Sequence, residues 1–149
     1  MGMQIIPNKL YLAMNAALFI AYNGSENQPV SGSAIVEYCD LNKRALEPVL
    51  QKLSKADIIV SVKGAKGGYF MPNPEDVSLK DIVEAFIEDV IPKKHDFSGY
   101  TDILNDTLFH CHQDWIASLS AITFKRLCQD ARSTGALNPI NKPVLNFTI

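Results

Sequence analysis

The fold is decided by residues 42–70, which read N-K-R-A-L-E-P-V-L-Q-K-L-S-K-A-D-I-I-V-S-V-K-G-A-K-G-G-Y-F. Apolar residues recur at intervals of three and four in the first half, and they are Leu46, Val49, Leu50 and Leu53. This spacing places them on one face of a helix, so we predict a helix over residues 43–56 with Asn42 as its N-cap. The second half is rich in β-branched residues around a glycine-rich turn at residues 64–68, which predicts a β-hairpin.

Two further helices are predicted upstream of this stretch. The first runs from Asn8, its expected N-cap, to about Ala21, where an Asn-Gly pair ends it. The second is short, is capped by Ser31 or Ser33 and ends in a tight turn at Asp40. Helix, helix, tight turn, helix and β-hairpin is the element order of a winged helix-turn-helix.

The sequence downstream of the hairpin predicts a short helix, a linker and one long helix. Ser78-Leu79-Lys80-Asp81 is a capping box that opens a helix through Phe86. Proline and glycine in the stretch that follows are typical of a linker. We therefore predict a winged helix-turn-helix domain over residues 1–90, a linker over 91–100, a long helix over 101–132 and an irregular tail over 133–149.

The long helix carries an apolar seam at nearly heptad spacing, formed by Leu104, Leu108, Cys111, Trp115, Leu119 and Ile122. Because a small domain cannot cover so long a stripe, we expect this helix to hold a twofold homodimer. The alternative is that it folds back onto its own domain. The expected fold class is mainly α with a small β-hairpin: a winged helix-turn-helix plus a long C-terminal dimerisation helix.

Charge is distributed unevenly, although the formal net charge is only −2. Residues 41–68 hold six Lys or Arg residues and two acidic residues, whereas residues 71–149 hold seven and eleven. A basic segment on an acidic body indicates one anion-binding face. We expect the third helix and the hairpin turn to contact double-stranded operator DNA through Asn42, Lys43, Arg44, Lys63, Gly64, Lys66 and Gly67. Taken singly, each of these basic residues is also typical of a solvated surface, and Asn42 of a helix cap.

Three stretches carry a resemblance to a known family: L-E-P-V-L-Q-K-L at 46–53, V-K-G-A-K-G-G-Y at 62–69 and V-S-L-K-D-I-V-E-A at 77–85. They resemble the Rrf-two (Rrf2) family of bacterial winged-helix transcriptional regulators. Its members include the iron–sulfur cluster biogenesis regulator, the nitric-oxide-sensing repressor and the cysteine-metabolism repressor. The resemblance implies a sequence-specific DNA-binding regulator, expected to be a repressor, in which the wing and recognition helix bind operator DNA and the long helix makes the dimer.

The chain departs from the family pattern at two places in the third helix. Pro48 lies inside it, where it removes a backbone donor unless the helix begins later, near Ala45. Ala45 stands where an aromatic residue is common in the family. The basic residues are retained, but the family's base contacts cannot be transferred residue by residue.

The cysteines depart from the family pattern as well. Cluster-binding relatives have three closely spaced cysteines between the wing helix and the long helix, whereas the only cysteine of this chain near that stretch is Cys111. We expect no cofactor and no metal, since an iron–sulfur cluster needs about four protein ligands. The alternative is a thiol- or metal-responsive regulator that uses Cys111 with His95 or His112. A small-molecule or redox effector of unknown identity is also consistent with a regulator.

Other function classes find little support in the sequence. It has no P-loop, dinucleotide-binding glycine pattern, G-x-S-x-G or metalloprotease His pair, so we predict no enzyme and no catalytic residues. A winged helix that binds proteins and not DNA is the remaining alternative. The three cysteines are odd in number and lack a C-x-x-C pair, which favours a cytoplasmic protein. We expect no membrane span, because the longest apolar stretch is shorter than ~20 residues.

Overall fold

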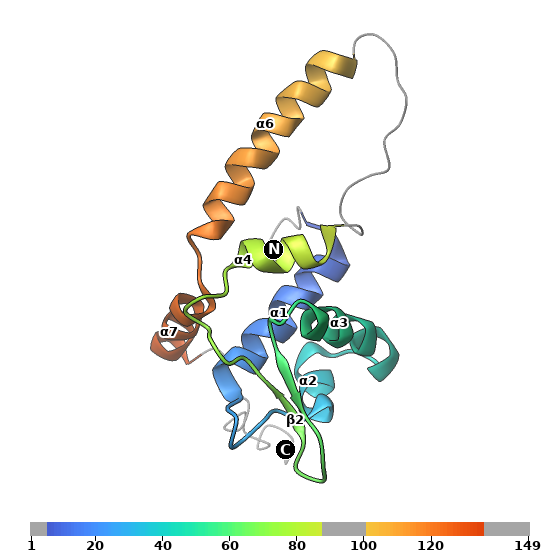
Figure 1. The fold of residues 1–149 in the computed structure, drawn as a ribbon, viewed down its shortest axis with the longest axis vertical. Helices are drawn as coiled ribbons and strands as arrows, with labels where there is room; N and C mark the ends of the chain where they lie inside the picture. The colour runs from blue at the N-terminus through green and yellow to red at the C-terminus, as the bar shows by residue number, and fades with distance from the viewer. Residues whose placement is uncertain (1–5, 88–100, 136–149) are drawn as a thin grey trace, which may run out of the picture.

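The computed structural model describes residues 6–87 and 101–135 (Figure 1). Its elements are α1 (Asn8–Asn23), α2 (Gly32–Cys39), α3 (Lys43–Lys55), β1 (Val60–Val62), β2 (Gly68–Phe70), α4 (Leu79–Ala85), α6 (Thr101–Ser120) and α7 (Phe124–Thr134). The prediction of a mainly α fold with one small hairpin is confirmed. The expected linker at 91–100 lies outside the described residues, as does the tail from residue 136.

Helix α1 is the centre of the domain, and α2, α3, α4, α7 and β2 all pack against it (Figure 1). Ala13, Ala16 and Ala17 are buried on it, and such small side chains allow neighbouring helices to approach closely. The expected cap at Asn8 is wrong by one residue, because Pro7 precedes the helix and its carbonyl accepts the Tyr11 N–H at 3.0 Å. None of the helices described is long and apolar enough to cross a membrane.

Local hydrogen bonds define the helix-turn-helix. The Ser31 hydroxyl accepts the Ala34 N–H at 3.2 Å, so Ser31, and not Ser33, caps α2. Asp40 ends α2 in the left-handed conformation, with φ 50°. Helix α3 begins directly afterwards, and its apolar face of Leu46, Val49, Leu50 and Leu53 is buried as the spacing predicts.

The hairpin forms the wing and is tied to the segment before α2. Strands β1 and β2 are antiparallel, and Val60 pairs with Phe70. Tyr69 also exchanges two backbone hydrogen bonds of 2.8 Å with Val30. This pairing requires the glycine at 68, because a Cβ there would lie 2.5 Å from the Val30 carbonyl carbon. The wing is therefore fixed to the helix-turn-helix at its base.

The predicted capping box before α4 is present, since the Asp81 carboxylate accepts the Ser78 N–H at 2.7 Å. Ile82 and Val83 of α4 are buried, as is Phe86, which follows the end of the helix. Lys52 of α3 places its ammonium group 5.3 Å from the centre of the Phe86 ring. Lys52 therefore packs against its own domain and is not one of the proposed DNA contacts.

The prediction of one continuous helix over residues 101–132 is wrong. Helix α6 ends at Ser120, and α7 begins at Phe124 with Thr123 as its cap and continues to Thr134, beyond the expected start of the irregular tail. The segment between them pairs with the chain before α4: Leu79 N–H donates to Ile122 at 3.0 Å and Phe124 N–H donates to Val77 at 2.9 Å. The chain turns because these long-range bonds replace the helical ones. Helix α7 then packs on α1, while α6 extends away from the domain (Figure 1).

Candidate nucleic-acid interface

The first turn of α3 presents Asn42, Lys43 and Arg44 at the surface. The Asn42 side-chain oxygen accepts the Ala45 N–H at 2.8 Å, so this residue caps the helix. A bidentate contact to adenine would need that same oxygen, which makes the cap the main role of Asn42. The Lys43 ammonium lies 4.0 Å from the Glu47 carboxylate, an exposed ion pair that contributes little and can exchange for a phosphate.

Arg44 lies on the solvent face of α3, and the sequence prediction missed two residues that share this face. Glu47 and Gln51 follow it by three and seven residues, and both are exposed. Glutamine can pair with adenine and glutamate can accept from cytosine, as arginine pairs with guanine. A helical projection of α3 would have found both, because intervals of three and seven return to the same side of a helix.

The wing turn exposes Lys63, Gly64 and Lys66. Gly64 has φ 118°, a conformation that side chains rarely adopt, and its carbonyl accepts the Gly67 N–H at 3.0 Å. A Cβ at Gly67 would lie 2.9 Å from that carbonyl oxygen. The two glycines are therefore required by the shape of the turn, which presents Lys63 and Lys66.

Helix α3 and the wing border one groove. Its lining includes Lys43 and Glu47 of α3, Ser33 of α2 and Tyr69 of β2, and it has a volume of about 350 Å³. The base of the wing and the first turns of α3 thus border the same depression. This is the relation that a winged helix needs when it places one helix in a major groove and the wing on the neighbouring backbone.

The predicted apolar seam on α6 is divided between two environments. Leu104 and Leu108 are 58% and 55% exposed, and Cys111 is exposed too. Leu119 is only 8% exposed and belongs to the domain core, with Trp115 packed against it. The prediction that Leu119 faces a partner is wrong for this reason, and the alternative of packing on the same domain holds for the base of α6. Ile122, also expected in the seam, lies after the helix end and is half-buried.

Two large apolar residues of α6 lie outside the predicted seam. Ile103 and Phe109 are 77% and 57% exposed. Each is one residue from a seam leucine, which places it about 100° around the helix from that leucine. The outer half of α6 therefore exposes apolar surface on several sides, more than one heptad stripe provides.

Within the described residues, the cysteines lack the arrangement that an iron–sulfur cluster site requires. Within the described ranges, no group of three or more His, Cys, Asp or Glu side chains could hold a metal ion. Cys111 is exposed on α6, whereas Cys128 is buried on α7, where burial raises the pKa of its thiol. Near Cys111, the His110 Nε2 lies 3.8 Å from Asp106, and the His112 ring lies 6.0 Å from that of Trp115. His95, the other suggested partner of Cys111, lies outside the described residues.

Comparison with known proteins relates the chain to transcription regulators. A family model named Rrf2 and described as an iron-dependent transcriptional regulator matches residues 6–130. The HTH-type transcriptional regulator IscR of Vibrio atlanticus is 32% identical over 124 residues, which cover 79% of this chain and 71% of its own. A Synechocystis protein named as an HTH-type transcriptional regulator, slr0846, is 28% identical over 86% of this chain and 90% of its own. The solved structure of T. potens IscR matches with a TM-score of 0.69 and 27% identity, over 87% of this chain and 89% of its own.

Proposed function

Because the chain belongs to the Rrf2 family of transcriptional regulators, and not to a family of enzymes, we propose that it binds operator DNA sequence-specifically as a homodimer. The observation that carries this proposal is the groove bordered by Lys43 of α3 and Tyr69 of the wing. This groove brings the basic first turn of α3 next to strand β2, which leads out of the basic wing turn, and so supports a shared DNA-binding face. The proposed contacts are Asn42, Lys43, Arg44, Lys63, Gly64, Lys66 and Gly67.

The proposal extends to repression in the cytoplasm. A dimer seated on its operator excludes other proteins from that DNA, and this is the simplest way for a DNA-binding regulator to act. The dimer contact is proposed to be the outer half of α6, where Leu104, Leu108 and Cys111 are exposed.

The test is selection of binding sites from random-sequence duplex DNA by the full chain, followed by footprinting. We expect a site with two related half-sites about one helical turn apart, or a multiple of it. Binding should weaken steeply with salt, with a logarithmic slope of about −0.9 for each phosphate contacted. Failure to enrich any sequence, with binding indifferent to salt, would favour the alternative of a winged helix that binds proteins.

Replacing Arg44 by alanine is expected to weaken binding to the selected site by about 1–3 kcal/mol and to relax sequence preference at one position of each half-site. The physical reason is that arginine can pair bidentately with a guanine edge. Competition binding against sites with each base substituted measures both effects. An alanine variant with unchanged affinity and preference would contradict a base-reading role.

Replacing Lys66 by alanine is expected to weaken all DNA sequences alike and to lower the salt slope by about one. Lys66 is exposed on the wing turn, where a phosphate contact releases one counterion without reading a base. Salt titrations of the selected site and of an unrelated duplex measure the change. A slope equal to that of the unaltered protein would show that this lysine does not face the backbone.

The purified protein is expected to contain no iron–sulfur cluster, even when prepared without oxygen, although the family model is described as iron-dependent. The reason is the donor set: Cys111 is the only cysteine between residues 40 and 127, and it stands alone on α6. Visible absorption and assays of iron and sulfide provide the measurement. Stoichiometric iron and sulfide that disappear in Cys111→Ala would contradict this expectation.

A further inference from the structure

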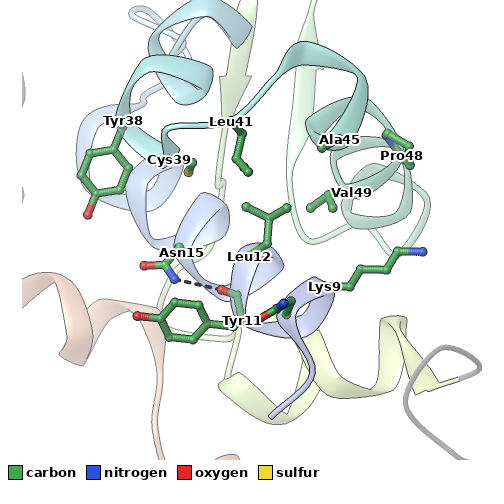
Figure 2. Close-up of a pocket in the computed structure, with 11 residues that line it drawn as sticks. Lys9, Tyr11, Leu12, Asn15, Tyr38, Cys39, Leu41, Ala45, Pro48 and Val49 are labelled. Atoms are coloured by element: carbon green, nitrogen blue, oxygen red, sulfur yellow. Dashed lines mark hydrogen bonds between the residues drawn. The ribbon is translucent and has the colours of Figure 1, made fainter. Parts of the chain in front are cut away.

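An apolar cleft lies behind the helix-turn-helix, between α1 and α3 (Figure 2). Its volume is about 740 Å³, within the range of small-molecule sites. Figure 2 shows Leu12 of α1, Leu41 of the turn and Val49 of α3 converging on it. These side chains form an apolar floor large enough for a ring system.

The edge of the cleft is polar and positively charged. Lys9 is the one charged residue among those that line the cleft in the described structure, and there is no carboxylate among them (Figure 2). Tyr11, Asn15 and Tyr38 add hydrogen-bonding groups on the side of the cleft opposite Lys9 (Figure 2). Cys39 also lines the cleft, and burial raises the pKa of its thiol, so this side chain acts as a neutral apolar wall.

We propose that the cleft binds a small organic anion with an aromatic or branched apolar body, and that the bound molecule weakens the binding of DNA by α3. The first half follows from the apolar floor and the cationic edge. The second half rests on the proposed function, because it concerns the helix that is proposed to read the operator.

Residues of α3 form one wall of the cleft, and through this wall a bound molecule would affect the residues that face DNA. Ala45 and Pro48 line the cleft and lie one and four residues after Arg44. Since α3 begins at Lys43, as predicted, Pro48 is inside the helix, and the alternative of a later start near Ala45 does not hold. Proline has no N–H, so the Arg44 carbonyl lacks its usual helical partner at this point. A molecule that contacts Ala45 and Pro48 therefore acts on a turn of α3 that lacks one backbone hydrogen bond.

The binding test uses 2-naphthoate as the anionic probe, 2-naphthamide as its neutral counterpart, and methyl NMR of the full chain. We expect naphthoate to shift the methyl resonances of Leu12, Leu41 and Val49, and to bind about three- to five-fold more tightly than the amide. Lys9→Gln should reduce naphthoate binding to the level of the amide. Lys55→Gln, which removes a charge from the exposed C-terminal end of α3, should leave naphthoate binding unchanged.

A second pair of variants tests the position of the site. Ala45→Phe fills the cleft and should abolish the shifts at Leu12 and Val49. Pro48→Glu, at an exposed position, brings a carboxylate to the edge of the cleft and should weaken naphthoate binding more than naphthamide binding. This second variant keeps the test decisive if Ala45→Phe does not fold. Shifts confined to methyl groups of α6, or undiminished naphthoate binding by folded Ala45→Phe, would overturn the site.

The coupling test adds the DNA site selected from random sequence. Saturating naphthoate should weaken DNA binding about five-fold or more, and DNA should weaken naphthoate binding by the same factor, because coupling between two sites is reciprocal. Equal DNA affinity with and without naphthoate would overturn the regulatory half. A protein that binds naphthoate in the cleft but binds no DNA would refute the proposed function together with the regulatory half, and would support the site itself.

Discussion

Replacing Leu104 and Leu108 together by glutamate is expected to convert the protein into a folded monomer and to weaken operator binding roughly 100-fold or more. Both leucines are more than half exposed on the outer part of α6, so the change should spare the domain core. Two buried carboxylates would make the proposed apolar contact between copies unfavourable. A monomer binds one half-site only and loses the gain from two linked contacts.

Sedimentation at micromolar concentration and a DNA titration measure the two effects. The matched control is Gln113→Glu with Ala117→Glu, which adds the same charge at exposed positions on the opposite side of α6. The control should remain dimeric and bind DNA at full affinity. An unaltered protein that sediments as a monomer, or a leucine double variant that keeps full DNA affinity, would refute the proposed dimer or its role.

Replacing Gly68 by alanine is expected to lower the free energy of unfolding by about 2–3 kcal/mol. The new Cβ would lie 2.5 Å from the Val30 carbonyl carbon and 3.0 Å from the Ser31 nitrogen, all backbone positions that cannot move aside as a flexible side chain can. Relieving the collision separates the wing from the start of α2 and sacrifices the two hydrogen bonds between Val30 and Tyr69. Denaturant titration measures the loss.

Gly32→Ala is the matched control for this prediction. Gly32 begins α2, and a Cβ there would meet nothing within 4 Å. Alanine at this position should leave stability unchanged or raise it by up to about 1 kcal/mol, through its greater helix propensity and lower entropy in the unfolded chain. Equal losses in both variants would mean that the effect at residue 68 is not caused by the close approach to Val30.

Helix α3 and the wing could be predicted from sequence because local features specify them. The spacing from Leu46 to Leu53 defines the buried face of α3, and Asn42 forms the expected cap. The break between α6 and α7 could not be predicted in the same way. Ile122 continues the apolar spacing, and neither glycine nor proline interrupts it; the chain turns because Ile122 and Phe124 bond to residues more than 40 positions earlier.

The candidate DNA interface could likewise be predicted from local sequence features, whereas the cleft could not. The basic residues of α3 and the wing turn were visible in the sequence, because charge and glycine pattern are local properties. The cleft behind α3 was not, since it depends on how far apart α1 and α3 pack. The sequence marked Ala45 and Pro48 as departures from the family pattern, but only the packing shows that both line one cavity.

The hydrogen bond between the Leu79 N–H and Ile122 fixes the C-terminal end of α6 to the segment before α4, so α6 can tilt as a rigid body about that pivot. Helix α6 is 20 residues long, or about 30 Å, so a tilt of about 5° at the pivot moves its N-terminal end by roughly 2.5 Å. In the proposed dimer both copies tilt, so the separation of the two α3 helices would change by up to about 5 Å, which exceeds the rise of one base pair, ~3.4 Å. Small adjustments at the pivot would then decide which operator spacings the protein tolerates.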